Sequence, residues 1–95
     1  MPYSLEIRES VRRYLRNMPL TREGRVRANT ALVEVVRNVE DAFRLDPRNR
    51  LETDSTCYHF TWVFKDGEST ETLYVVVDDA TADYGVLRVV YVELL

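Results

Sequence analysis

This sequence has one cysteine, one tryptophan, one histidine and one lysine in 95 residues. With Cys57 alone, no disulfide can form within the chain, which argues against a small secreted disulfide scaffold. The opening MPYSLEIRES mixes charged and apolar residues where a signal peptide needs an apolar stretch. Apolar runs such as LYVVV are far shorter than the roughly 20 residues that span a bilayer. We therefore expect a cytoplasmic protein with no membrane association.

Basic residues are scarce in the second half of the chain, and acidic residues are outnumbered in the first. Residues 1–50 hold eleven arginines against seven acidic residues, whereas residues 51–95 hold two basic residues against nine acidic ones. Such asymmetry is typical of a surface that meets nucleic acid or an acidic partner, and equally of helices that are solvated by Arg and Glu. The net charge of −3 argues against broad phosphate binding. The length and the 45% hydrophobic content predict a single folded domain over residues 1–95.

Helical periodicity occupies the first half of the chain. Val11, Tyr14, Leu15 and Met18 follow the spacing i, i+3, i+4, i+7 and predict a helix over roughly residues 9–18 that ends before a proline. A longer helix is expected to begin after Thr21, whose hydroxyl suits an N-cap, and to run to about Leu45. The apolar stripe of this second helix consists of Ala28, Leu32, Val35, Val36, Val39, Ala42 and Phe43.

After residue 56 the hydrophobic period changes to two, which predicts strands. Three are expected, over 57–65, 71–78 and 86–93, and the alternation of Tyr3, Leu5 and Ile7 indicates a further short one at the N-terminus. Asp66-Gly67 predicts a type I′ hairpin turn between the first two of the three. The order β-α-α-β-β-β indicates the α+β class, with two helices packed on one face of a small, mostly antiparallel sheet.

The strand at 57–65 carries an aromatic stripe of Tyr58, Phe60, Trp62 and Phe64. Such a stripe is either a stacking platform for unpaired bases or the apolar surface that the helices cover. We interpret it as core, because no basic residues alternate with the rings. One Cys and one His two residues apart cannot supply the three or four ligands of a metal site, so we expect no metal and no cofactor.

The opposite face of the same strand carries the candidate functional residues. His59 and Thr61 lie there, joined by Tyr74 from the next strand and, depending on the register, by either Arg88 or Tyr91 from the last. His59, Arg88 and Tyr91 are the candidates for acid–base work and for stabilising phosphate charge. The alternative is a solvent-facing or partner-binding sheet face, since no second acid or base is evident.

The strand YSLEI, the Arg-rich segment ESVRRYLRN, a long second helix and three strands that begin near CYHFTWVF together resemble the RelE/ParE family. The members of that family are small bacterial toxins of type II toxin–antitoxin systems. The resemblance implies either an mRNA nuclease that works on the ribosome or a gyrase inhibitor, neutralised by an antitoxin that wraps the toxin. Nuclease members carry basic residues on the middle strands and an Arg with a Tyr or His after the last strand. This sequence reads YHFTWVF at the first of these places and VELL at its end.

Two functions remain open. The first is a toxin-like protein that acts on RNA or on a nucleic-acid enzyme, ribonuclease-like if it is an enzyme. Its contacts with nucleic acid or a partner are expected at Arg48, Arg50, His59, Thr61, Tyr74 and Arg88. The second is a non-catalytic protein-interaction module on the same scaffold, which forms a homodimer through the exposed sheet face or through the edge of the last strand. Because the nuclease residues are not matched, a non-catalytic mechanism is favoured.

Overall fold

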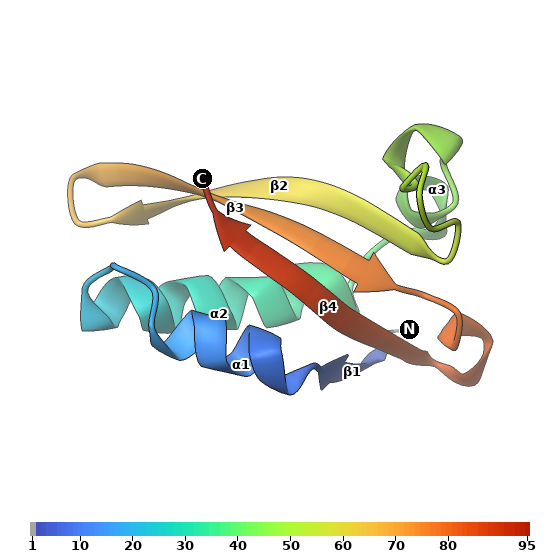
Figure 1. Ribbon diagram of the computed structural model, residues 1–95, viewed down its shortest axis with the longest axis horizontal. Coiled ribbons are helices and arrows are strands. Elements are labelled where there is room, and N and C mark those ends of the chain that lie inside the picture. Colours follow the sequence, from blue (N-terminus) through green and yellow to red (C-terminus); the bar gives the residue numbers. More distant parts are fainter. Residues whose placement is uncertain (1) are drawn as a thin grey trace.

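The computed structural model describes residues 2–95, and its elements follow the expected order (Figure 1). The strands are β1 Ser4–Ile7, β2 Cys57–Asp66, β3 Ser69–Asp78 and β4 Val86–Leu94. The helices are α1 Glu9–Arg16, α2 Arg22–Arg37 and α3 Asp41–Arg44, with short 3₁₀ turns η1 Pro47–Asn49 and η2 Ala82–Tyr84. The four strands form one sheet in the order β1-β4-β3-β2, in which only the β1–β4 pair is parallel. The α+β class and the mostly antiparallel sheet are confirmed.

Helix α2 begins where the sequence indicates. The hydroxyl of Thr21 accepts a hydrogen bond of 3.0 Å from the backbone N–H of Gly24, one of the free amides of the first turn. The carboxylate of Asp66, at the far end of β2, accepts a further bond of 3.0 Å from the N–H of Thr21. The start of α2 is therefore fastened to the β2–β3 hairpin.

The expectation that the second helix runs to about Leu45 is wrong. Helix α2 ends at Arg37, and after Asn38 a separate single turn forms α3. The carbonyl of Arg37 accepts a hydrogen bond of 2.9 Å from the N–H of Tyr3, and the Arg37 side chain donates to the carbonyl of Tyr3 at 3.1 Å. The segment leading into β1 thus takes the backbone group that a continuing helix would use.

The core lies between the sheet and the helices α1 and α2, which share one side of it (Figure 1). Tyr58 and Phe64 are buried there, and Phe60 and Trp62 pack against the same cluster while partly exposed. The aromatic stripe therefore faces the helices, as expected. The other buried members are Val11, Leu15, Met18, Ala28, Leu32, Val36, Leu73, Val75, Val77, Leu87, Val89 and Val92.

The β2–β3 hairpin turns where expected, but not by a type I′ turn. Asp66 pairs with Ser69, so the two central residues are Gly67 and Glu68. Only Gly67 has a positive φ, +62°, whereas a type I′ turn requires positive φ at both central residues. Glycine at the first central position is typical of a type II′ turn. Asp66 is thereby left free to bind Thr21.

A β-bulge in β4 decides which residues share a face. Val77 pairs with Val89 and Val76 pairs with Tyr91, so Val90 is the extra residue. Before the bulge Arg88 lies on the face opposite the helices, and after it Tyr91 lies on the same face. We expected either Arg88 or Tyr91 on the face of His59 and Thr61, and the structure places both there.

The edge of the last strand was an expected route to a homodimer. In the structure β4 lies inside the sheet, paired with β3 on one side and with β1 along Val86–Val89 on the other. Along that stretch it offers no free edge. A dimer through this part of the last strand is therefore ruled out by the strand order.

Candidate functional site

The open sheet face is the side of the sheet opposite α1 and α2. We define it by eight of the residues that the strand register places there: His59, Thr61, Val63, Lys65, Tyr74, Val76, Arg88 and Tyr91. Val76 is buried beneath its neighbours, whereas Val63 and Tyr91 are 58% and 48% exposed. The face therefore combines an apolar floor with accessible aromatic and apolar side chains.

A histidine–tyrosine pair lies near the middle of the open sheet face. His59 Nδ1 and the hydroxyl of Tyr74 are 2.9 Å apart, and the two rings meet edge to face at 5.7 Å between centroids. Cross-strand register explains the contact, because His59 pairs with Val76 and Thr61 pairs with Tyr74, which makes His59 and Tyr74 diagonal neighbours. Tyr91 extends the group, with its ring 6.2 Å from that of Tyr74.

Tyr91 is suited to donate a hydrogen bond and poorly suited to act as a base. Partial burial and the neighbouring Glu93 raise the pKa of the Tyr91 hydroxyl above its ordinary value, so it keeps its proton at neutral pH. Among residues 2–95 no carboxylate is hydrogen-bonded to His59. The group thus offers hydrogen-bonding atoms and ring surface, without the carboxylate that orients a typical catalytic histidine.

Arg88 lies at the β1 end of the open sheet face and is ion-paired. Its guanidinium donates two hydrogen bonds, of 3.0 and 2.9 Å, to one carboxylate oxygen of Glu6 on the parallel neighbour β1. Both side chains are about half exposed, so the pair is weak in water and an incoming anion would compete with Glu6. The predicted phosphate-stabilising residue is thus present on the face but already engaged.

The two loop arginines, Arg48 and Arg50, differ in how far their side chains are exposed. Arg48 is 88% exposed and folds back on Asp46, with 2.7 Å between guanidinium and carboxylate. Arg50 donates two hydrogen bonds, of 2.7 and 2.6 Å, to the carboxylate of Asp79. Of the two, only Arg48 is free to meet a large ligand without breaking a buried contact.

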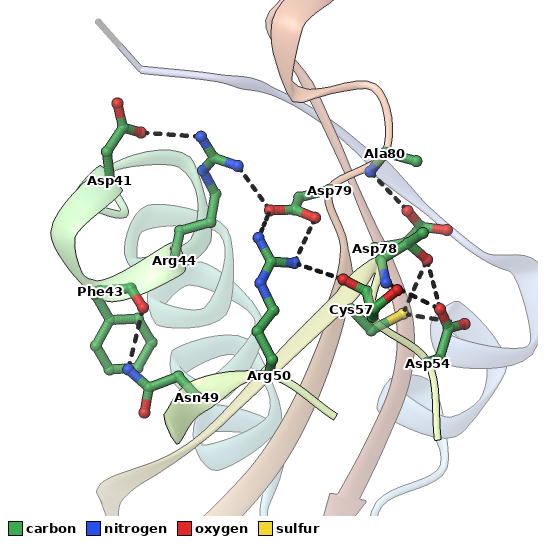
Figure 2. A network of polar contacts seen from close by, with 12 residues as sticks. Asp41, Phe43, Arg44, Asn49, Arg50, Asp54, Cys57, Asp78, Asp79 and Ala80 are labelled. Carbon is green, nitrogen blue, oxygen red and sulfur yellow. Dashed lines mark hydrogen bonds and ion pairs between the residues drawn. The ribbon is translucent and has the colours of Figure 1, made fainter. Parts of the chain in front are cut away.

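Sequence reasoning missed the polar network around Asp79, which lies in the acidic run DDATAD, residues 78–83. The Asp79 side chain is 5% exposed and accepts hydrogen bonds from Arg50 and, at 2.7 Å, from Arg44 on α3 (Figure 2). Burial alone raises the pKa of this carboxyl, but the hydrogen bonds from the two arginines outweigh burial and hold the pKa below its ordinary value. No pattern in the sequence marks Asp79 as the buried member of its acidic run.

Tyr58 lies beside this network, and its hydroxyl is buried with no hydrogen-bond partner in the described part of the chain. Burial and the nearby Asp79 raise the pKa of the hydroxyl strongly, which keeps it protonated. Cys57, on the same strand, is buried under the preceding loop, and burial raises the pKa of its thiol. Neither side chain is placed to act as a nucleophile.

Within residues 2–95 no three His, Cys, Asp or Glu side chains gather closely enough to hold a metal ion. In the same residues no helix is long and apolar enough to cross a membrane.

Comparison with solved structures finds that this chain is similar to a mutant of the E. coli toxin RelE in the free state, in which two arginines are replaced by alanine. The TM-score is 0.53 and the identity 25%, over 97% of this chain and 82% of that one. No family model and no curated protein sequence matches the chain. The similarity supports the RelE-like fold that the order of elements led us to expect.

Proposed function

We propose that this protein is a RelE-like toxin that acts by binding a nucleic-acid enzyme through its open sheet face, rather than by cleaving RNA. The observation that carries the proposal is the state of the two cations on this face. Arg88 is paired with Glu6, and Lys65 donates a hydrogen bond of 2.8 Å to Thr70. Phosphoryl chemistry depends on cations that are aimed at the reacting group, and in the unbound protein these two contact Glu6 and Thr70 rather than the His59–Tyr74 pair.

The accessible residues of the face suit a protein target. Val63 and Tyr91 are well exposed, and the Tyr74 ring lies against both His59 and Tyr91. Aromatic side chains with a polar tip are enriched at the centres of protein interfaces, where the ring is buried and the hydroxyl finds a partner. The acidic net charge of −3 is a further argument against a long phosphate backbone as the target.

RNA cleavage is the second candidate, and the His59–Tyr74 pair favours it. A half-buried imidazole held by a tyrosine hydroxyl can exchange a proton with a ribose hydroxyl or a leaving oxygen. Arg88 would then have to leave Glu6 to reach the phosphate. An antitoxin is the partner expected under either function, and the similarity to RelE supports that expectation.

Growth arrest in a bacterial host on induction of the full chain tests the proposal. We expect arrest by the wild type and by the double variant His59→Ala, Arg88→Ala, which removes the groups that cleavage needs. The double variant Val63→Lys, Tyr91→Lys, which disrupts the apolar contact area, is expected to abolish arrest. Tyr84→Lys is the matched control, because Tyr84 is 85% exposed on η2, outside the open sheet face.

Each other outcome has a definite meaning. Loss of arrest in the His59, Arg88 variant, with its circular dichroism spectrum unchanged and with new RNA ends in cells arrested by the wild type, would establish the cleavage mechanism in place of binding. Absence of arrest by any of these proteins would leave a non-toxic interaction module on the same scaffold. Sequencing of RNA ends from arrested cells separates the first two mechanisms directly.

A further inference from the structure

Four arginines gather around a groove between α1 and the first turns of α2. Arg12 and Arg16 lie four residues apart on α1, and Arg22 and Arg25 lie three apart on α2, so each pair faces the same side of its helix. The groove has a volume of about 460 Å³, and no acidic residue lines it. It belongs to the helical side of the molecule and shares no residue with the open sheet face.

The arrangement of these arginines costs the fold stability. Like charges at i, i+4 on a helix repel, and cations in the first turn of a helix oppose its dipole. Arg22 is the first residue of α2 and Arg25 the fourth. Glu23 and Asp66 offset part of this charge, but neither lines the groove. Within the fold the charge is thus only partly balanced.

The partners of the four guanidinium groups leave room for a ligand. Among residues 2–95 neither Arg12 nor Arg22 forms an ion pair. Arg16 forms a highly exposed ion pair with Glu9 at 3.4 Å, and Arg25 donates a hydrogen bond of 2.8 Å to the carbonyl of Leu20. Two cations are therefore free at the groove and a third is weakly held.

The remaining lining of the groove is largely apolar. Ile7 at the end of β1, Leu15 on α1 and Val26 on α2 contribute to it. Val26, which lies between two arginines in the sequence, is 59% exposed. No aromatic ring lines the groove, so unpaired bases would find no stacking surface there. A phosphate backbone would satisfy the arginines but leave the apolar side chains in water.

We propose that this arginine groove binds an acidic amphipathic segment of a partner protein, with its carboxylates on the arginines and its apolar side chains against Ile7, Leu15 and Val26. Charge complementarity selects the acidic face of the segment, and apolar burial fixes its orientation. Because the groove lies apart from the open sheet face, the proposal does not depend on which target that face binds. A partner bound here contacts the helices and leaves the open sheet face accessible.

Fluorescence anisotropy with the full chain and three labelled probes tests this inference. The first probe is a synthetic peptide of about 16 residues with Leu at helical spacing and Glu at the other positions. The second is the same peptide with Lys in place of Glu, and the third is a single-stranded RNA of equal length. We expect the Glu peptide alone to bind, and its affinity to fall as sodium chloride is raised from about 50 to about 500 mM.

Two charge reversals locate the binding. The variant Arg22→Glu is expected to weaken binding of the Glu peptide about tenfold or more, whereas Arg13→Glu, an equal charge change on an exposed α1 residue that does not line the groove, changes it little. Since Glu suits the first turn of a helix, Arg22→Glu should unfold at a temperature no lower than that of the wild type. A loss of binding in this variant is then not a loss of folding.

The opposite results would overturn the inference. Equal binding of the Glu and Lys peptides, or no binding of the Glu peptide at a protein concentration of about 100 μM, would exclude an acidic partner at this groove. RNA binding that Arg22→Glu abolishes would reassign the groove to nucleic acid. Because these readouts are affinities, they can fail while growth arrest through the open sheet face persists, and the reverse.

Discussion

The carboxylate of Asp79 is bound by the guanidinium of Arg50 through two parallel hydrogen bonds, of 2.7 and 2.6 Å, across 29 residues of chain. Such a bidentate pair has the geometry in which arginine binds carboxylates most strongly. Arg44 completes the site, so a single buried anion joins the turn after β3 to α3 and to the loop that leads into β2 (Figure 2). The segment 38–56, which contains no long element of its own, depends on this anion for its position.

Replacement of Asp79 by Asn is expected to lower the free energy of unfolding by about 3 kcal/mol, because two partly buried arginines lose their counter-charge. Urea unfolding monitored by circular dichroism measures the change. The matched control is Glu6→Gln, which breaks the half-exposed pair with Arg88 and should cost less than about 1 kcal/mol. Equal costs for the two variants would contradict a special role for the buried pair.

The same carboxylate predicts a dependence of stability on pH. Its pKa in the folded protein lies below the ordinary value of 3.8, so the folded state binds this proton less readily than the unfolded chain. The stabilisation is therefore complete well above pH 3.8 and is lost as the pH falls through the lower, folded pKa. We expect the stability difference between wild type and Asp79→Asn to shrink from about pH 7 to about pH 2.5 in urea titrations at each pH. A difference that stays constant over this range would show that the charge of Asp79 is not what stabilises the protein.

Tyr58→Phe is expected to leave stability unchanged or to raise it slightly, within about 1 kcal/mol. The Tyr58 hydroxyl is buried without a partner among the described residues, so its removal breaks no hydrogen bond and removes a desolvation penalty. The ring, which meets Phe43 edge to face at 6.2 Å, is retained by phenylalanine. Tyr14→Phe provides the contrast, because the Tyr14 hydroxyl accepts a hydrogen bond of 2.7 Å from the N–H of Leu94. A larger loss at Tyr58 than at Tyr14 in urea unfolding would show that the Tyr58 hydroxyl has a partner after all.

The periodicities of the chain predict most of the fold, since the buried positions of α1, β2 and β3 follow spacings that a single helix or strand dictates. One feature of the fold depends on a contact between distant segments and could not be predicted in this way. Helix α2 ends at Arg37, whose carbonyl bonds to the N–H of Tyr3. Asn38, at the C-cap, is a local sign of this end, but the apolar spacing that continues to Phe43 masks it in the sequence.

The residues of the candidate site were predictable only where strand alternation is strict. His59, Thr61 and Tyr74 share a face because strict alternation places them there. Arg88 and Tyr91 share it only through the bulge at Val90, and the run VLRVVYV has valines at both parities, so its pattern does not show where the register shifts. The burial of Asp79 could not be predicted, because its partners Arg44 and Arg50 come from distant, polar segments of the sequence.

Two substitutions, one at the start of α2 and one at the end of β2, test the link between that helix and the hairpin. A Cβ on Gly24 would lie 2.5 Å from Cγ and Oδ1 of Asp66, the carboxylate that binds both the N–H and the hydroxyl of Thr21. Gly24→Ala should therefore displace Asp66 and destabilise the protein by about 1–3 kcal/mol, although alanine is the better helix former by about 1 kcal/mol.

The sign of that effect should reverse once Asp66 is truncated. In an Asp66→Ala background the obstructing atoms are gone, and Gly24→Ala is expected to stabilise the protein by up to about 1 kcal/mol through helix propensity alone. A double-mutant cycle from urea unfolding of the wild type, the two single variants and the double variant gives the coupling energy. Additive effects would mean that Asp66 moves aside freely, and that its bonds to Thr21 contribute little to holding α2 against the hairpin.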